Sequence, residues 1–203
     1  MNPYPKIVAV SLDGSESPSA EHAICAAKGE FVPLAADAPL PRWASGLLLT
    51  GSDPFLGEMS PVPPALFAAI DTDLPILAVE SGLHALNIAF GGRSPLPLED
   101  RGALDGPAKR RIFLAPGGKV ADAIGGAGPV TVSAANSHSV LRQCQAGSLM
   151  STAFAVDDGA VQALELPGRH WILGVQWRAA WLEEQPAGFE NLFHAFVGAA
   201  DGR

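Results

Sequence analysis

Charged side chains are scarce in this chain, and their scarcity limits the partners that it could bind. Asp, Glu, Lys and Arg together make up 17% of its 203 residues, and the formal net charge at pH 7 is −8. The Lys and Arg residues form no basic cluster of the kind that contacts a phosphate backbone. The composition therefore argues against nucleic acid as a partner.

Disulfide-forming cysteines and long apolar runs are also missing. Two cysteines, Cys25 and Cys144, do not make a disulfide framework. No apolar run approaches the roughly 20 residues that a membrane span requires. The N-terminal segment Met1–Lys6 leads into a strand without the pattern of a secretion signal. We therefore expect a cytoplasmic protein with no membrane partner.

The chain does have enough apolar material for a full α/β core, since 48% of its residues are hydrophobic. Short aliphatic runs alternate with segments of helical spacing, which is typical of a mainly parallel sheet with right-handed crossovers. Strands are predicted over 6–12, 30–35, 43–50, 74–79 and 171–177, and helices over 19–29, 65–70, 83–90 and 189–200. Four more strands, predicted at 111–114, 130–133, 151–156 and 161–166, indicate an antiparallel edge. We expect one domain over residues 1–203.

One stretch, Leu74–Gly92, has the pattern on which a functional prediction depends. It reads L-P-I-L-A-V-E-S-G-L-H-A-L-N-I-A-F-G-G. The pattern predicts a short buried strand, a sharp turn at Glu80-Ser81-Gly82 and a helix that ends at two glycines. Strand, tight turn and helix make the geometry of a nucleophile elbow. Such a turn lifts one residue to the carboxyl edge of the sheet, where open α/β proteins bind ligands.

This stretch resembles the catalytic elbow of the class I glutamine amidotransferases, and is nearest to their γ-glutamyl-γ-aminobutyrate hydrolase branch. Three more segments are similar to family motifs in the same order, and a fourth matches one. They are Gly46–Asp53, Asn136–His138, Asp158–Glu165 and, as the match, L-G-V-Q-W at Leu173–Trp177. The resemblance implies a flavodoxin-like three-layer sandwich with a mainly parallel central sheet and an antiparallel edge.

The resemblance also implies a cysteine nucleophile, a histidine base and a glutamate that orients the histidine. In this sequence those three positions hold Glu80, Arg178 and Ala180. Family members hold the oxyanion with backbone N–H groups from a glycine loop and from the residue after the nucleophile. Here the second loop glycine is replaced by Ser52, after Gly51, and the residue after the nucleophile position is Ser81.

An arginine cannot accept a proton at neutral pH, and a carboxylate is a poor nucleophile towards an unactivated amide. We therefore predict a degenerate protein that lacks the triad and binds a small molecule or a partner subunit, such as an amide ligase or synthase. The alternative is a hydrolase or amidotransferase-like enzyme that acts on a γ-glutamyl or related amide through Glu80. In that case Arg178 would bind an anionic group of the substrate.

The predicted pocket comprises the elbow and the polar residues that the motifs bring towards it. Its members are Gly51, Ser52, Glu80, Ser81, His84, His138 and Arg178. Since Glu80 and His84 lie four residues apart, they share a helix face, and with His138 they could form a metal site. We favour a hydrogen-bonded His84 instead, and expect neither a metal nor any other cofactor.

Two further expectations concern the former catalytic pair and the cysteines. Glu80 and Arg178 carry opposite charges at positions that face each other in the family, so we expect a salt bridge between them. Cys144 could be a relocated nucleophile, but its neighbours lack an elbow pattern and favour a plain free thiol. Cys25 is expected to lie in the core, on the apolar face of its helix.

Overall fold

The fold is built around a sheet whose central strands are aliphatic on both faces. The computed structural model describes residues 4–51, 62–98, 108–134, 137–168 and 170–202. Within them, nine strands form one sheet in the order β2-β1-β3-β4-β11-β10-β9-β6-β7. Its parallel part comprises β2 (Glu30–Leu34), β1 (Lys6–Ser11), β3 (Gly46–Thr50), β4 (Ile76–Val79) and β11 (Ile172–Val175). Strands β3, β4 and β11 are buried at every residue, as expected of parallel strands covered on both faces.

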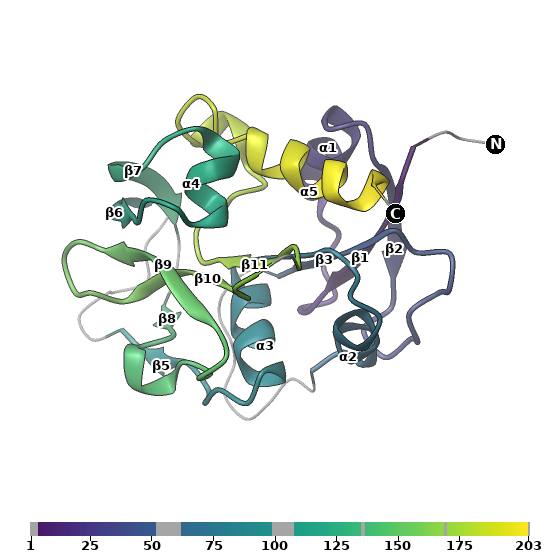
Figure 1. Cartoon of the computed structure of the whole chain (residues 1–203), viewed down its shortest axis with the longest axis horizontal. Coiled ribbons are helices and arrows are strands. Elements are labelled where there is room, and N and C mark those ends of the chain that lie inside the picture. The colour runs from purple at the N-terminus through teal and green to yellow at the C-terminus, as the bar shows by residue number, and fades with distance from the viewer. Residues whose placement is uncertain (1–3, 52–61, 99–107, 135–136, 169, 203) are drawn as a thin grey trace.

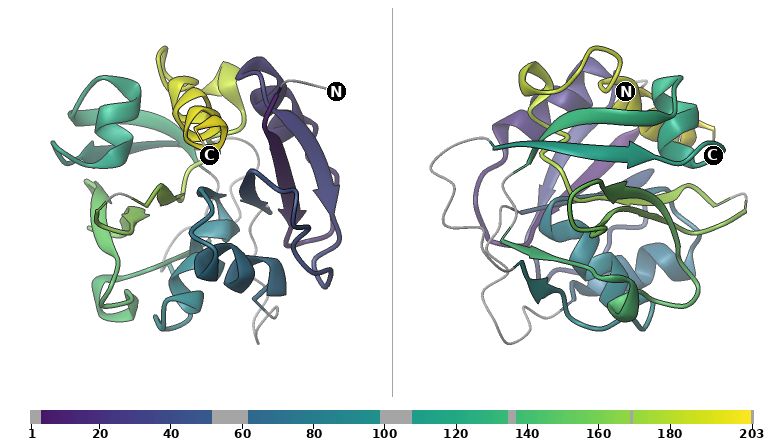
Figure 2. Two further views of the ribbon diagram at one scale, coloured as in Figure 1. Left: turned by 45° about the vertical axis from the view of Figure 1, so that its right-hand side comes forward. Right: turned by 90° about the vertical axis from the view of Figure 1, so that its left-hand side faces the viewer.

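The second part of the sheet is antiparallel, as the sequence predicts. It comprises β10 (Val161–Glu165), β9 (Met150–Ala155), β6 (Ala108–Leu114) and β7 (Gly128–Ala134). Strands β6 and β7 lie side by side as paired arrows (Figure 2). Side chains on β6 alternate between exposed and buried, which is the pattern of a sheet with one solvated face. A small separate ribbon pairs β5 (Leu96–Pro97) with β8 (His138–Ser139).

Helices cover the two faces of the sheet and complete a three-layer sandwich (Figure 1). One face carries α1 (Pro18–Ala26), α4 (Lys119–Ile124) and α5 (Asn191–Asp201), and the other carries α2 (Pro64–Asp71) and α3 (Ser81–Ala89). Two short 3₁₀ turns lie at Arg142–Cys144 and Leu182–Glu184. The predicted fold class is therefore confirmed. Among the described residues, no helix has the length and apolarity that crossing a membrane would require.

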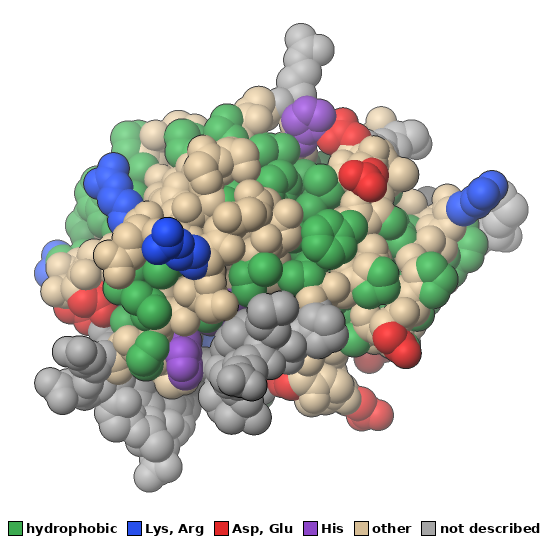
Figure 3. All heavy atoms as spheres, turned by 90° about the horizontal axis from the view of Figure 1, so that it is seen from below, with side chains coloured by type: hydrophobic (Ala, Val, Ile, Leu, Met, Phe, Trp, Pro, Cys, Tyr) green, Lys and Arg blue, Asp and Glu red, His purple; other side chains and the backbone are tan. Residues whose placement is uncertain are grey.

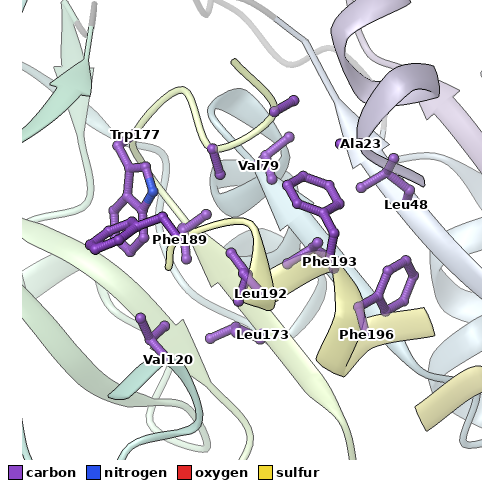
Figure 4. Close-up of a cluster of buried hydrophobic side chains, with 14 of the residues drawn as sticks. Ala23, Leu48, Val79, Val120, Leu173, Trp177, Phe189, Leu192, Phe193 and Phe196 are labelled. Atoms are coloured by element: carbon purple, nitrogen blue, oxygen red, sulfur yellow. The ribbon is translucent and has the colours of Figure 1, made fainter. Parts of the chain in front are cut away.

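The core on the α5 side contains a group of large aromatic side chains among aliphatic ones (Figure 4). Trp177, Phe193 and Phe196 are each no more than 1% exposed and pack above the aliphatic strands. Trp177 contacts Phe189 edge-on, with ring centroids 6.0 Å apart. Because Trp177 directly precedes Arg178, this packing fixes the segment that follows β11 at the predicted site.

One expectation from the sequence needs correction, and one helix was not predicted. Cys25 is exposed rather than buried, because α1 buries Ala20, Ala23 and Ile24, and the next position turns towards solvent. The sequence pattern also does not predict α4. That helix has six residues, and its first backbone N–H, from Lys119, donates to the Glu165 carboxylate at 2.7 Å. A contact with a distant strand therefore supports this short helix.

Charge remains sparse on the surface, as the composition predicts. On the face shown in Figure 3, the Lys and Arg side chains of the described residues lie apart from one another. The sequence K-R-R at 109–111 does not make a patch either, because Arg110 is buried. Its guanidinium pairs with Asp158 at 2.6 Å and Asp157 at 3.4 Å.

Candidate functional site

The predicted elbow is present, and its backbone is strained. Strand β4 ends at Val79, Glu80 has φ 54° and ψ −118°, and α3 begins at Ser81. A non-glycine residue with positive φ is uncommon and costs on the order of 1–3 kcal/mol. The Glu80 N–H donates to the Val175 carbonyl at 2.9 Å, so the sheet holds the residue in this conformation.

Two glycines let the elbow pack closely against β3. A Cβ at Gly82 would lie 2.7 Å from the Leu49 carbonyl oxygen, so any side chain would push α3 away from the strand. A Cβ at Gly51 would lie 2.4 Å from the Ser81 hydroxyl, and Gly51 has φ 150°. Both positions therefore require glycine for the close approach of the elbow to β3.

The carbonyl of Gly51 faces the first residue of α3. It accepts hydrogen bonds from the Ser81 backbone N–H at 3.2 Å and from the Ser81 hydroxyl at 2.8 Å. The Ser81 N–H occupies the position from which the family resemblance implies an oxyanion donor. In this chain that donor is already engaged by the protein. The neighbouring Ser52 lies outside the described residues.

Arg178 reaches across the site towards Glu80, as the opposite charges predict. Its Nε lies 3.8 Å from Glu80 Oε1, and the two side chains are 16% and 14% exposed. This distance makes an ion pair but exceeds that of a hydrogen bond. The expected salt bridge is therefore present, although it is not the bidentate contact that an Arg–carboxylate pair can make.

The sequence does not predict the second carboxylate that holds Arg178. Glu184 Oε2 lies 3.3 Å from Arg178 Nη1 and also accepts a hydrogen bond from the Ser133 hydroxyl at 2.6 Å. The Trp181 ring packs on the same guanidinium, 3.9 Å from its carbon to the ring centroid. In the sequence Glu183-Glu184 resembles ordinary surface charge. The only sequence signal for the contact between Arg178 and Glu184 is that the two residues lie six positions apart.

The remaining triad position contributes no polar group. Ala180 is 4% exposed and packs in the core on the α5 side. The three positions at which the family resemblance implies a triad therefore hold a carboxylate, a guanidinium and a methyl group. With Glu184, they form a cluster of two acids around one base, which we call the charge cluster (Glu80, Arg178 and Glu184).

The two predicted pocket histidines lie in different surroundings. His84 on α3 is fully buried, and its Nε2 lies 2.9 Å from Gln176 Oε1. His138 on β8 is half-buried, with its Nδ1 2.9 Å from the Ser137 hydroxyl. Among the described residues, no three His, Cys, Asp or Glu side chains gather closely enough to hold a metal ion. Glu80, His84 and His138 are thus not brought together as a ligand set.

Cys144 lies in a 3₁₀ turn and is buried. Its carbonyl accepts hydrogen bonds from the Asn87 side-chain amide at 2.9 Å and from the Arg93 N–H at 2.8 Å. Asn87 also accepts the Ala146 N–H at 2.8 Å. These hydrogen bonds attach the turn to Asn87 on α3. Cys144 therefore has the surroundings of a structural residue.

The sequence matches the Peptidase C26 family over residues 64–179, which is more than half of the chain. The chain belongs to the Peptidase C26 family. The class I glutamine amidotransferase-like resemblance is thereby confirmed, and the matched region contains the elbow and Arg178 of this Peptidase C26 protein.

Similarity to a second protein supports the same family assignment. The chain is 33% identical over 145 residues to Rv2859c, a glutamine amidotransferase homologue of Mycobacterium tuberculosis. The match covers 68% of this chain and 44% of the relative, so the Peptidase C26 chain spans less than half of that protein.

Solved structures share the fold at low sequence identity. A protein from Thermoplasma acidophilum that is described as a subunit of GMP synthase has a TM-score of 0.77 at 18% identity, covering 98% of this chain and 95% of its own. A glutamine amidotransferase from Methylobacillus flagellatus has a TM-score of 0.67 at 18% identity, covering 92% of this chain and 73% of its own. At this identity the likeness demonstrates the fold alone.

Exchanging Glu80 for glycine and for alanine should reveal the strain of the elbow. Both changes remove the carboxylate and its ion pair, so the comparison between them isolates the backbone. Because glycine adopts positive φ without a Cβ clash, we expect Glu80→Gly to be more stable than Glu80→Ala by about 1–2 kcal/mol. Urea unfolding of the two variants measures the difference.

The matched control is the same pair of changes at Glu21, an exposed residue of α1. There Glu21→Ala should be more stable than Glu21→Gly by about 0.5–1 kcal/mol, because alanine has the higher helix propensity. If alanine were also the more stable at position 80, the positive φ of Glu80 would not represent stored strain.

Double-mutant cycles should separate the two partners of Arg178. We expect the coupling of Arg178→Ala with Glu184→Gln to be about 1–2 kcal/mol, since that contact is a charged hydrogen bond. The coupling with Glu80→Gln should stay below about 1 kcal/mol, because that pair is longer and makes no hydrogen bond. Free energies of unfolding provide both values.

Glu183→Gln supplies the control for these cycles, because Glu183 is exposed and precedes Glu184 directly. Its coupling with Arg178→Ala should be close to zero. A stronger coupling to Glu80 than to Glu184 would mean that the bridge across the former active site, and not Glu184, holds the guanidinium.

Proposed function

We propose that this chain is a non-catalytic member of the Peptidase C26 family, which uses the former active site to bind a partner rather than to hydrolyse an amide. The observation that carries the proposal is the charge cluster. The position of the base holds a guanidinium that contacts Glu184 at 3.3 Å and Glu80 at 3.8 Å.

Thioester chemistry needs three things that this site does not supply in the described residues. A thiolate nucleophile is replaced by the carboxylate of Glu80, and a proton acceptor is replaced by Arg178, which stays protonated. The backbone N–H of Ser81 donates to the Gly51 carbonyl instead of pointing at a developing oxyanion. Restoring one of these groups alone would leave the other two missing.

The surface beside the charge cluster supports a binding role. Trp181 is 43% exposed while its ring packs on the Arg178 guanidinium. Tryptophan and arginine are the residue types that contribute most to binding energy at protein interfaces. A structural neighbour is described as a subunit of a synthase, which is in keeping with a domain that works beside another enzyme. We therefore favour a partner protein, such as an amide ligase or synthase, over a free metabolite.

One observation favours the enzymatic alternative. The elbow retains its positive φ at Glu80, a conformation that serves to present a reacting group. In that alternative, Glu80 attacks or deprotonates a γ-glutamyl or related substrate. To bind an anionic group of that substrate, Arg178 would have to give up its contact with Glu80 or with Glu184. This requirement weighs against the alternative.

The unmodified protein should release no ammonia from glutamine and hydrolyse no γ-glutamyl anilide above the uncatalysed rate. Glu80→Cys alone should remain inactive, because Arg178 cannot accept the thiol proton. Coupled ammonia detection and anilide absorbance measure the two reactions. Turnover by the unmodified protein that Glu80→Ala abolishes would establish the enzymatic alternative.

The binding role should depend on Trp181. A tagged full-length chain is isolated from its source cells with its partner, and the partner is identified by mass spectrometry and then purified. We expect Trp181→Ala to weaken the affinity for this purified partner at least tenfold, the loss of a central interface residue. Calorimetric titration gives the affinity.

Trp43 offers a matched control, since it is 51% exposed and also lies against a cation, with Lys6 Nζ 5.3 Å from its ring centroid. Trp43→Ala should leave the affinity within about twofold. Equal losses in the two variants, or none in Trp181→Ala, would place the interface elsewhere.

A further inference from the structure

A second pocket lies at the carboxyl ends of β1, β2 and β3, next to the start of α1. It has a volume of about 710 Å³. Its lining includes the last residues of the three strands, which are Ser11, Leu34 and Thr50. Pockets of roughly 300–1,000 Å³ are typical of small-molecule sites. None of the charge cluster residues lines this pocket.

The strand order explains why a pocket forms there. The chain leaves β1 for β2 on one side and then returns to β3 on the other side. Figure 2 shows β1 and β2 as neighbouring arrows with the same direction. Where successive connections diverge in this way, a crevice opens outside the carboxyl ends of the strands. Ala9 and Phe31 belong to the core on the α1 side, so this crevice opens on the face opposite α3.

The lining of this pocket combines an apolar floor with negative charge. Ala9, Phe31 and Pro33 supply apolar surface, and Glu16 and Glu21 supply two carboxylates. No Lys or Arg is among the described residues that line it. Within the described part of the chain, neither Glu16 nor Glu21 has an ion-pair partner.

Two hydroxyl groups in the lining also lack partners among the residues that the structure describes. Thr50 is 4% exposed, and its hydroxyl makes no hydrogen bond to any of those residues. Ser17 occupies the N-cap of α1 without a side-chain capping bond. By contrast, the Ser11 and Ser15 hydroxyls both donate to the Asp13 carboxylate. A buried hydroxyl without a partner has unused hydrogen-bonding capacity that a ligand can satisfy.

From this lining we infer that the pocket binds a small organic cation, an amine with an apolar body. The ammonium group would lie near Glu16 and Glu21, with Thr50 and Ser17 as hydrogen-bond partners, and the apolar body would pack on Phe31. An anion would meet two carboxylates and no base, so the lining selects against it. This inference is independent of the proposed function, because it uses no residue of the former triad.

A charge series of one molecular shape tests the inference. The probes are phenethylammonium, 2-phenylethanol and phenylacetate, each titrated into the full chain and followed by protein-observed NMR. We expect phenethylammonium to bind at least five times more tightly than the alcohol, and phenylacetate more weakly still. Added salt should weaken the binding of the amine, because exposed charges are screened.

Variants then locate the site. Glu16→Gln and Glu21→Gln should each weaken phenethylammonium binding by about two- to fivefold, the range for partly exposed charge pairs. Asp122→Asn, an exposed charge removal on α4, is the matched control and should leave the affinity unchanged. Three results would each overturn the inference: equal affinity for the three probes, no detectable binding of phenethylammonium, or full affinity in both glutamine variants.

Discussion

The constraint on which this structure most depends is the positive φ of Glu80 between β4 and α3. The sheet holds the residue through its N–H, and Gly82 and Gly51 permit the backbone contacts that no side chain would allow. Because the strand ends and the helix begins at this point, the conformation is imposed by the whole sandwich rather than by local preference. The elbow therefore persists even though its residue is a glutamate.

Around that fixed point, the opposite charges of Glu80, Arg178 and Glu184 compensate one another. A carboxylate at Glu80 beside a histidine or an apolar residue would be a poorly paired, mostly buried charge. Arg178 supplies the opposite charge, and Glu184 with Trp181 holds the guanidinium in place. A guanidinium that two acids and a ring fix in position suits recognition better than proton transfer. The charge cluster beyond β4 and β11 and the pocket at the ends of β1, β2 and β3 lie on different strands of the same carboxyl edge of the sheet.

The predictions from the sequence were most accurate where a local pattern and a family motif agreed. The elbow, the parallel strands and the antiparallel edge were predicted from the spacing of apolar residues, which differs between strands and helices. The predictions failed where a distant partner decides. The short helix α4 depends on the Glu165 carboxylate, and the exposure of Cys25 depends on the angle at which α1 packs. The contact of Glu184 with Arg178 likewise needs the turn at Leu182–Glu184.

By itself, the sequence determined the fold class and the family, because these depend on residue types at fixed spacings. Only the tertiary structure decided which groups those residues meet. The occupied N–H of Ser81, the burial of His84 against Gln176 and the pocket at the ends of β1 and β3 all join segments far apart in the chain. Their geometry follows from sheet order and layer packing, which no local pattern encodes.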